Sequence, residues 1–314
     1  MSGIVIAVSA GDPQGIGPEV AVAAIARQAA ARPEVRYRIH GDAAQLVALG
    51  AREDERVTLV DRPFDRAALT PPPGPEGGRA ALAALESAFD DVVSGRADAL
   101  CTAPLSKEAV AAVAPGFTGH TGWLSKRCGV RAQMCLASEA LRVFLLTEHL
   151  PLAAVPAALE RGVVADFLRA TRRALREDLG LEAPRVALLA LNPHAGEGGH
   201  LGREEIDVLV PALADAGGAE AGFSGPHSAD TFFRAERLEA CDAVVACYHD
   251  QGLIPLKLLS FGRAANLSFG LPVVRTSPDH GTAYDLAGRG LADAGSMGEA
   301  LEWAVRIVER RRGR

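Results

Sequence analysis

The chain has 314 residues, a hydrophobic fraction of 48%, a charged fraction of 23% and a formal net charge of −6. These values are ordinary for a globular protein and leave room for one large domain or two lobes. The negative charge argues against general nucleic-acid binding, for which a basic surface is expected. No apolar run approaches the roughly 18 residues that a membrane span needs. The five cysteines form no Cys-x-x-Cys pair, so the sequence favours a reducing cytoplasm.

Basic residues gather at the C-terminus, where Arg306 and residues 310–312 follow the helical pattern EALEWAVRIVE. Cations at the C-terminal end of a helix interact favourably with its dipole. We therefore interpret this cluster as a solvated helix end and not as a nucleic-acid-binding arm.

Apolar runs and helical patterns alternate through the first half of the chain. The pattern predicts strands at 4–9, 35–40, 57–60 and 97–104, and helices at 20–30, 43–50 and 77–95. A proline-rich loop, 62–76, interrupts the alternation and is typical of a surface loop or a crossing between lobes. Alternation of this kind indicates an α/β fold with a largely parallel sheet.

The first strand ends in a glycine-containing turn, with Gly11, Gly15 and Gly17 before a helix that Pro18 and Glu19 open. Strand, glycine turn and helix is the layout of a phosphate or dinucleotide site. The dinucleotide fingerprint would need glycine where Val20 stands, and no Gly-Lys-Ser/Thr of a P-loop follows. A structural turn and a ligand loop both remain open.

A second glycine-containing segment, GFTGHTG at 116–122, leads into a predicted helix at 123–128. Its His120 and Thr121 would offer an imidazole, a hydroxyl and backbone N–H groups to an anion at the helix entrance. The alternative is a threonine N-cap beside an incidental histidine. Ser106 is expected to cap the short helix before this segment, at 108–113.

The second half continues with predicted strands at 132–138, 141–147, 185–192 and 243–247, and helices at 163–180, 204–216 and 251–257. The strand ending at Asn192 runs into PHAGEGGH, with glycines and two histidines in a few residues. Glycine loses more conformational freedom on folding than other residues, so this composition is unfavourable for a simple connection. We interpret the loop as functional.

Three of these strands each deliver a histidine just beyond the apolar run: His149, His194 and His249. Neutral imidazoles from separate strands can bind a divalent transition metal and leave coordination positions for a substrate. Their separations of 45 and 55 residues match no zinc-finger spacing. His40 has only a core or surface interpretation, whereas His200, His227 and His280 remain ambiguous.

Polar and charged side chains then follow the last of these strands within about thirty residues: Lys257, Asn266, Arg275 and the turn Asp279–Thr282. In open α/β sheets, ligands bind at strand ends and in the loops that follow them. The stretch is therefore a candidate ligand site.

These motifs together resemble the 4-hydroxythreonine-4-phosphate dehydrogenase family of vitamin B6 biosynthesis and its catabolic relatives. The resemblance covers nearly the whole chain and rests on GDPQGIGPE, TAPLSK, GFTGHT, TEHLPL, LNPHAGEGGHLGREE, ADTFF, YHDQGLIPLK, FGRAANLSFGLP and RTSPDHGTAYDLAGRG, in that order. LNPHAGEGGH and YHDQG are the most specific of them.

The resemblance implies a two-lobed α/β/α fold like that of isocitrate and isopropylmalate dehydrogenases. The single chain would form two intertwined lobes that share a central cleft, with boundaries that the sequence does not define. It also implies a homodimer with active sites at the interface, NAD or NADP as cofactor, and one divalent metal per subunit (Zn, Mg, Mn or Co). A phosphorylated small molecule is the expected substrate.

Motif positions carry the family's roles over to particular residues of this sequence. The metal ligands would be His149, His194 and His249. The substrate contacts would be His120, Thr121, Lys257, Asn266 and Arg275. The turn that holds the nucleotide's adenosine end would be Asp279, His280, Gly281, Thr282 and Ala283. Asp230 and Asp250, beside the presumed ligands, are candidates for proton transfer, and Lys257 would add positive charge.

The implied reaction is oxidation of 4-phosphooxy-L-threonine at C3, followed by decarboxylation to 3-amino-2-oxopropyl phosphate and CO2. Two positions depart from the family: Gly122 stands where an acidic residue is usual, and His227 where a less polar residue is common. They leave open D-threonate or D-erythronate 4-phosphate as the substrate, with dihydroxyacetone phosphate as the product. A non-catalytic metal- or nucleotide-binding member and a metal-dependent hydrolase without NAD are minor alternatives.

Overall fold

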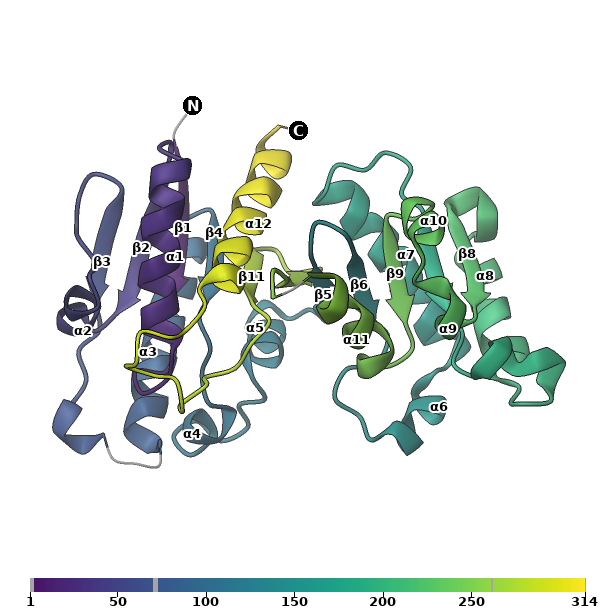
Figure 1. The fold of residues 1–314 in the computed structure, drawn as a ribbon, viewed down its shortest axis with the longest axis horizontal. Coiled ribbons are helices and arrows are strands. Elements are labelled where there is room, and N and C mark those ends of the chain that lie inside the picture. The colour runs from purple at the N-terminus through teal and green to yellow at the C-terminus, as the bar shows by residue number, and fades with distance from the viewer. Residues whose placement is uncertain (1–2, 70–72, 261, 314) are drawn as a thin grey trace. The chain divides into compact units, whose positions relative to one another are not determined.

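A computed structural model of the protein describes residues 3–69, 73–260 and 262–313. The chain divides into two compact units (Figure 1). The first unit consists of Met1–Ala132 and Ala265–Arg314, and the second unit of Gln133–Ala264. The second unit is thus an insertion between the two segments of the first.

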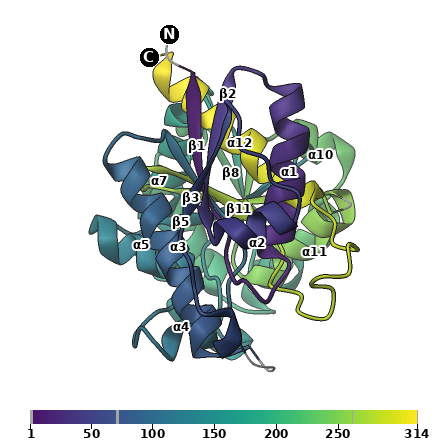
Figure 2. The same ribbon diagram turned by 90° about the vertical axis from the view of Figure 1, so that its left-hand side faces the viewer.

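The first unit is built on a sheet with the strand order β3 (Val57–Asp61), β2 (Val35–Gly41), β1 (Ile4–Ser9), β4 (Ala99–Thr102), β11 (Val274–Pro278) and β10 (Ala265–Phe269). Its strands pair in parallel except β10, which is antiparallel to β11. Helices α1 (Gly17–Ala31) and α12 (Gly295–Arg312) pack side by side on one face (Figure 2). Helix α3 (Pro75–Val93) lies on the other face, against β1 and β2.

Helix α3 shows why the sequence forms this layer. Its buried residues Ala81, Ala84, Leu85 and Ala88 recur every three or four positions and so line one side of the helix. Pro75 occupies the first turn, where its missing N–H leaves no hydrogen bond unmade. Burial of this apolar stripe against β1 and β2 fixes the helix to the sheet.

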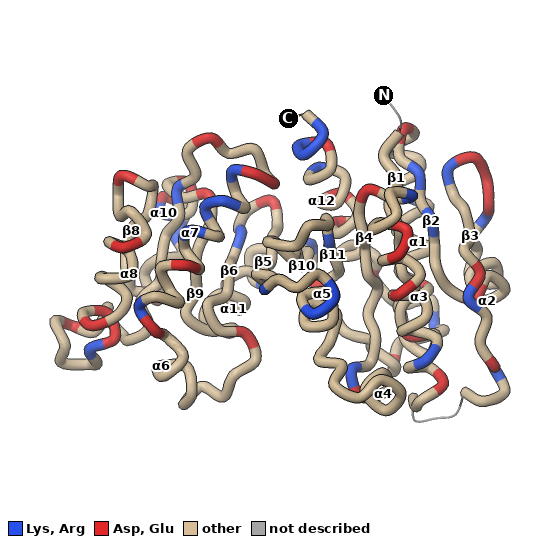
Figure 3. Tube along the Cα trace, turned by 180° about the vertical axis from the view of Figure 1, so that it is seen from behind, with Lys and Arg blue, Asp and Glu red and all other residues tan. Residues whose placement is uncertain are grey.

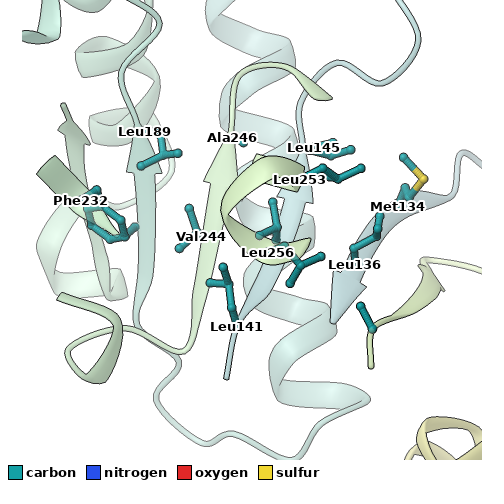
Figure 4. Close-up of a cluster of buried hydrophobic side chains, with 13 residues drawn as sticks. Met134, Leu136, Leu141, Leu145, Leu189, Phe232, Val244, Ala246, Leu253 and Leu256 are labelled. Carbon is teal, nitrogen blue, oxygen red and sulfur yellow. The ribbon is translucent and has the colours of Figure 1, made fainter. Parts of the chain in front are cut away.

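The second unit has the strand order β5 (Gln133–Ala137), β6 (Arg142–Leu145), β9 (Ala243–Ala246), β7 (Val186–Leu189) and β8 (Phe223–His227). Strands β6, β9, β7 and β8 are parallel, and β5 is antiparallel to β6. Helix α11 (His249–Ser260) packs on β6 and β9. Its Leu253 and Leu256 lie beside Leu145 and Val244 in the buried core (Figure 4).

The remaining α-helices lie in the connections between strands. They are α2 (Ala43–Ala48), α4 (Lys107–Ala111), α5 (His120–Cys128), α6 (Val155–Ala158), α7 (Arg161–Glu177), α8 (Val210–Asp215), α9 (Ala229–Phe232) and α10 (Ala235–Glu239). Short 3-10 helices are η1 (Arg66–Ala68), η2 (Leu152–Ala154), η3 (Pro193–Gly199) and η5 (Gly218–Ala221), and η4 (Glu205–Leu209) is a π-helix.

The predicted α/β fold with a largely parallel sheet is confirmed, and the local differences concern short elements and the bounds of helices. The sequence analysis missed β8, α9 and α10, which are short and carry no clear period. The helix predicted at 204–216 begins as the π-helix η4, and the one predicted at 251–257 begins at His249 and runs to Ser260. The proline-rich loop contains η1, and its residues 70–72 lie outside the described ranges.

The basic C-terminal cluster forms the last turn of α12 (Figure 3). There Arg312 Nη2 donates to Asp98 Oδ1 at 2.6 Å, which supports the interpretation as a helix end. All five cysteines are free thiols. Within the ranges that the structure describes, no helix is both long and apolar enough to cross a membrane.

Candidate active site

The three strand-end histidines of the second unit follow neighbouring parallel strands. His149 comes after β6, His249 opens α11 directly beyond β9, and His194 comes after β7. Strand β9 lies between β6 and β7 and is parallel to both. The carboxyl ends of parallel strands meet at one edge of a sheet, so the topology brings to a single edge what the sequence spaces 45 and 55 residues apart.

Two of these histidines form a pair. The ring centroids of His149 and His249 are 5.6 Å apart. Hydrogen bonds join the strand ends beneath them, because Leu146 N–H donates to the Ala246 carbonyl at 2.9 Å and Thr147 Oγ1 donates to the Cys247 carbonyl at 2.7 Å. The two imidazoles are therefore held together by the backbone that carries them.

Gln251 links the end of β9 to the end of β7. Its buried side chain accepts from Cys247 N–H at 2.7 Å and donates through Nε2 to the Ala190 carbonyl at 2.6 Å. The sequence analysis did not single out this residue. Its only signal was a polar amide just beyond a buried strand, and the partners that explain it are 4 and 61 residues away.

The loop that carries His194 has an unusual backbone. Residues 194–198 all have positive φ, from 43° at Glu197 to 78° at Gly196. L-residues avoid this left-handed region, so His194, Ala195 and Glu197 need the surrounding structure to hold them there. The glycines of PHAGEGGH thus serve a left-handed turn that presents a histidine.

The candidate proton-transfer residues lie close to these histidines. Asp250 Oδ1 and His249 Nδ1 are 2.6 Å apart, which leaves Nε2 as the ring nitrogen open to a ligand. The Ser228 hydroxyl donates to Asp230 at 2.7 Å and lowers the pKa of that carboxyl, with a smaller contribution from His194. Lys257 follows Asp250 by seven residues on α11, which places both on one side of the helix.

Two of the three histidines are arranged as ligands of one divalent metal would be. A carboxylate on the second nitrogen of a ligating imidazole, as at His249, is the usual support for a metal-bound histidine. A separation of 5.6 Å lies within the reach of two rings that share one ion, since each nitrogen would lie about 2.1 Å from it. Among the described residues, no three His, Cys, Asp or Glu side chains lie close enough to hold an ion. The three-histidine site therefore stays a prediction.

Arg275 is the centre of a separate group in the first unit. It is 3% exposed on β11, donating through Nη1 to Ser268 Oγ at 3.0 Å and through Nη2 to Thr102 Oγ1 at 2.8 Å. Burial lowers the pKa of Arg275 to about 10. Ser268 pairs with Arg275 across the ladder, so Asn266, two residues before Ser268, projects from the same face as Arg275. Two predicted substrate residues thus share one surface.

His120 lies near Arg275 and opens helix α5. Burial, with the positive charges of Arg275 and Lys107, holds the pKa of His120 well below its usual range. Its Nε2 is buried and has no hydrogen-bond partner among the described residues. Gly119 is the N-cap with φ of 105°, so the alternative in which Thr121 caps the helix is wrong.

Lys107 was missed as a candidate site residue. A Cβ at Gly119 would lie 2.9 Å from its Cε, so glycine lets the lysine side chain pass over the start of α5. The sequence analysis treated this segment only as a helix cap, and Ser106 is indeed the cap, accepting from Ala109 N–H at 3.1 Å. The position of Lys107 directly before the helix predicted at 108–113 is the signal that could have identified it as a site residue.

The predicted nucleotide turn, residues 279–283, is anchored at both ends. Asp279 accepts from Ser296 Oγ at 2.8 Å, at the start of α12, and the Thr282 carbonyl accepts from Ile16 N–H at 2.9 Å. Between these anchors, His280 Nδ1 lies 3.2 Å from the Gly281 carbonyl, and Ala283, just after the second anchor, has a φ of 40°. The adenosine role of these residues stays a prediction.

The glycine turn after β1 is part of the same packing. A Cβ at Gly15 would lie 2.8 Å from the Thr282 carbonyl, and one at Gly17 would lie 2.5 Å from the Ala10 carbonyl. Tyr284 OH also donates to the buried Asp12 at 2.7 Å. These contacts favour the structural interpretation of the turn.

The fold that carries the strand-end histidines in one unit and the buried arginine group in the other is also found in dehydrogenases. A β-decarboxylating dehydrogenase from Thermococcus kodakarensis shares the fold at 16% identity, with 98% of this chain and 85% of that chain covered and a TM-score of 0.50. That likeness concerns the fold alone.

Closer relatives define the family. The model of the pyridoxal phosphate biosynthetic protein PdxA matches residues 19–304. A 4-hydroxythreonine-4-phosphate dehydrogenase of Burkholderia vietnamiensis is 44% identical, with 98% of this chain and 97% of the relative covered. The crystal structure of a 4-hydroxythreonine-4-phosphate dehydrogenase from Klebsiella pneumoniae superposes with a TM-score of 0.84 at 34% identity, over 98% of this chain and all of that one.

The chain belongs to the PdxA family. It is accordingly an enzyme, a nicotinamide-dependent oxidoreductase that acts on a hydroxyl group. The resemblance drawn from the motifs is confirmed. The individual site residues, the homodimer and the metal remain predictions.

Proposed function

We propose that this protein oxidises 4-phosphooxy-L-threonine at C3 and releases CO2, giving 3-amino-2-oxopropyl phosphate for pyridoxine phosphate synthesis in the cytoplasm. The observation that carries the proposal is the row of histidines at the ends of β6, β9 and β7. It occurs in a chain 44% identical, over 98% of its length, to an enzyme of that name.

His149, His194 and His249 would hold the divalent metal, and residues 279–283 the NAD or NADP. When bound, the metal would lower the pKa of the substrate hydroxyl and stabilise charge on its oxygen, while the nicotinamide would accept hydride. The strand ends fix the imidazoles before substrate arrives, which reduces the rearrangement that binding requires.

The first unit supplies the anion site in this proposal. Arg275 Nε and His120 Nε2 are buried nitrogens without a hydrogen-bond partner in the described parts of the chain. Buried polar groups are normally paired, so an absent ligand is expected to complete them. Arginine binds phosphate or carboxylate with two parallel hydrogen bonds, and Lys107 adds a second positive charge. A substrate that carries both a phosphate and a carboxylate suits this group.

Asp230 and Asp250 are the candidates for moving protons. The Ser228 hydroxyl and His194 lower the pKa of Asp230 and so favour its ionised form, the form that a proton acceptor must have. Asp250 is held against His249 Nδ1 and so also orients that imidazole. Lys257, exposed on the same side of α11, would supply positive charge to the substrate.

A homodimer completes the proposal. Helix α11 exposes Ile254 by 59% and Leu258 by 69%, four residues apart on one side of the helix. Large apolar side chains grouped on a helix face favour contact with another chain. The same helix carries Asp250 and Lys257, which agrees with active sites near a subunit interface.

The test is NADH formation by the purified protein with NAD and a divalent metal, comparing 4-phosphooxy-L-threonine with D-threonate and D-erythronate 4-phosphates. We expect a kcat/KM advantage of at least about 100-fold for the amino acid, because the sugar acids carry a neutral hydroxyl in place of its C2 ammonium and would leave groups placed for the ammonium unpaired. Turnover without NADH would contradict the oxidoreductase chemistry. No turnover of any of the three would contradict the proposed substrate class.

One observation favours the hydroxy acids as a second candidate. Where acidic residues are usual, Gly122 packs closely against Thr118, and a Cβ there would collide with Thr118 Oγ1. An acidic side chain at position 122 would require Thr118 to move, so this chain has no carboxylate there to pair with a substrate ammonium. Preference for D-threonate or D-erythronate 4-phosphate in the same assay would establish this alternative and leave the histidine site unchanged.

A further inference from the structure

Glu205 is a buried carboxylate that the proposed reaction does not use. It is 3% exposed and begins the π-helix η4, which follows the loop that carries His194. π-Helical turns are rare and occur frequently at functional sites.

Glu205 gathers three N–H groups from the end of β7. Its Oε1 accepts from the backbone N–H groups of Leu191 and Asn192, each at 2.8 Å. Its Oε2 accepts from Asn192 Nδ2 at 2.9 Å. A carboxylate is the side chain that can accept on both oxygens at once, so the charged group is matched to its donors.

Glu204 fixes the orientation of the Asn192 amide. Its Oε2 accepts from the same Nδ2 at 2.7 Å, and this hydrogen bond lowers the pKa of Glu204. Because both carboxylates require the NH2 group of Asn192, the amide cannot turn over without placing its oxygen against theirs. The side chain of Asn192, two residues before His194, therefore has one orientation.

The left-handed turn is fitted around Glu205. Gly196 has φ of 78°, and a Cβ there would lie 2.7 Å from Glu205 Oε2. His194, Ala195 and Glu197 adopt left-handed backbone, which is unfavourable for L-residues. Other interactions must offset the cost of this backbone conformation. The hydrogen bonds of Glu205 are placed to do so, because they lie at the point where the turn leaves β7.

We propose that Glu205 is the positioning residue that fixes His194 for metal binding. It acts through the backbone of residues 191–196 and does not contact the ion. This inference rests on the proposed metal site. An amide at position 205 would retain one accepting oxygen and turn an NH2 group toward an N–H of residues 191–192, so the turn would relax and His194 would leave its place.

The experiment is a titration of the metal-free full-length protein with Co²⁺, followed by calorimetry and by the visible absorption of the bound ion. Glu205→Gln is expected to weaken Co²⁺ binding about 10- to 100-fold, the usual effect of removing support from a metal ligand. Glu204→Gln is the matched control, since it changes the neighbouring carboxylate and leaves both backbone N–H groups paired. It is expected to weaken Co²⁺ binding clearly less than Glu205→Gln does.

Introducing Glu205→Gln into the His194→Ala variant distinguishes a loss of His194 positioning from a general loss of structure. There Glu205→Gln should have no further effect on the residual affinity of the His149–His249 pair, because the residue that it positions is gone. Should Glu205→Gln fail to fold, Gly196→Ala, whose Cβ would displace Oε2, is expected to give the same loss of affinity. Gly198→Ala is its control, since nothing lies within 4 Å of a Cβ at that position.

The outcomes separate the two proposals. If wild type binds no Co²⁺, or His194→Ala binds it equally well, the metal site itself is wrong. If His194→Ala loses affinity while folded Glu205→Gln and Gly196→Ala bind as wild type does, the positioning role is overturned and the metal site stands. An equal loss from Glu205→Gln in the His194→Ala background would also overturn it.

Discussion

The two units use the same sequence features for different purposes. Both have a histidine at the end of a parallel strand and a glycine-containing loop after a buried strand. In the first unit, His40 ends β2 and is fully buried, bonded through Nδ1 to Ser87 Oγ at 2.8 Å and 3.1 Å from Asp91 through Nε2. In the second unit, the side chains of His149 and His249 are 64% and 37% exposed.

The loops differ in the same way. Gly11, Gly15 and Gly17 are required because other backbone segments approach too closely for a Cβ. In the PHAGEGGH loop, Gly198 meets nothing within 4 Å and serves the left-handed conformation instead. A glycine cluster or a strand-end histidine therefore indicates a site only when the neighbouring elements leave its side chains accessible.

The largest effect that this comparison predicts concerns His194. His194→Ala should lower kcat/KM by more than about 100-fold, since loss of a ligand exceeds the loss of support for one. His200→Ala is the control, because it changes an exposed histidine at the end of the same loop. Steady-state NADH formation measures kcat/KM for both variants. Equal values would contradict a role for His194 that His200 lacks.

Gly11→Ala should be the most destabilising change in the glycine turn of the first unit. Its Cβ would collide with the Pro104 carbonyl, and its φ is 77°. Overpacking and left-handed strain together should lower the free energy of unfolding by about 3 kcal/mol. Urea denaturation measures this, with Gly50→Ala as the control, since Gly50 has φ of 98° and open space around it. Equal losses would show that packing is not the reason for glycine at 11.

His40 predicts a pH dependence of stability. Burial lowers its pKa from 6.5 to about 4, opposed by Asp91 and reinforced by Arg38 and Arg62. The unfolded chain therefore binds a proton between pH 6.5 and 4 that the folded protein excludes, so stability falls as the pH falls through that window. Between pH 7 and 5 the contribution is about 2 kcal/mol.

Urea denaturation at pH 7, 6 and 5 checks this for wild type and His40→Gln. The variant should have the shallower dependence, because glutamine does not titrate. Parallel curves for the two proteins would contradict a buried, neutral His40.

Gly198→Ala should have the smallest effect. Its φ of 66° costs alanine about 1 kcal/mol, without a collision. Thermal or urea unfolding should show this modest loss, and metal affinity should be retained. A loss as large as that of Gly11→Ala would mean that both loops are tightly packed.

The sequence predicted what depends on local pattern. Apolar runs located most strands, and the position of His149, His194 and His249 after three of them was readable from the chain alone. The sequence could not show that β9 lies between β6 and β7, because strand order is decided by packing between distant segments. Nor could periodicity reveal that β5 and β10 run antiparallel to their neighbours β6 and β11.

Residues that act through distant partners were also missed. Gln251 and Glu205 appear in the sequence as ordinary polar residues in helical patterns, and only the folded chain shows the backbone groups that they bind. The left-handed turn at His194 was visible as a glycine excess, but its conformation depends on the Glu205 carboxylate that fills it. Lys107 gained meaning only from its passage over Gly119.

We expect one divalent ion to bind at the ends of β6, β9 and β7. Crystals of the full-length protein grown with Co²⁺ and measured on both sides of the cobalt absorption edge would locate it. We expect one anomalous peak per chain, about 2.1 Å from a ring nitrogen of each of His149, His194 and His249. A peak on other residues, or none at these three with the ion bound in solution, would show that the histidines are not its ligands.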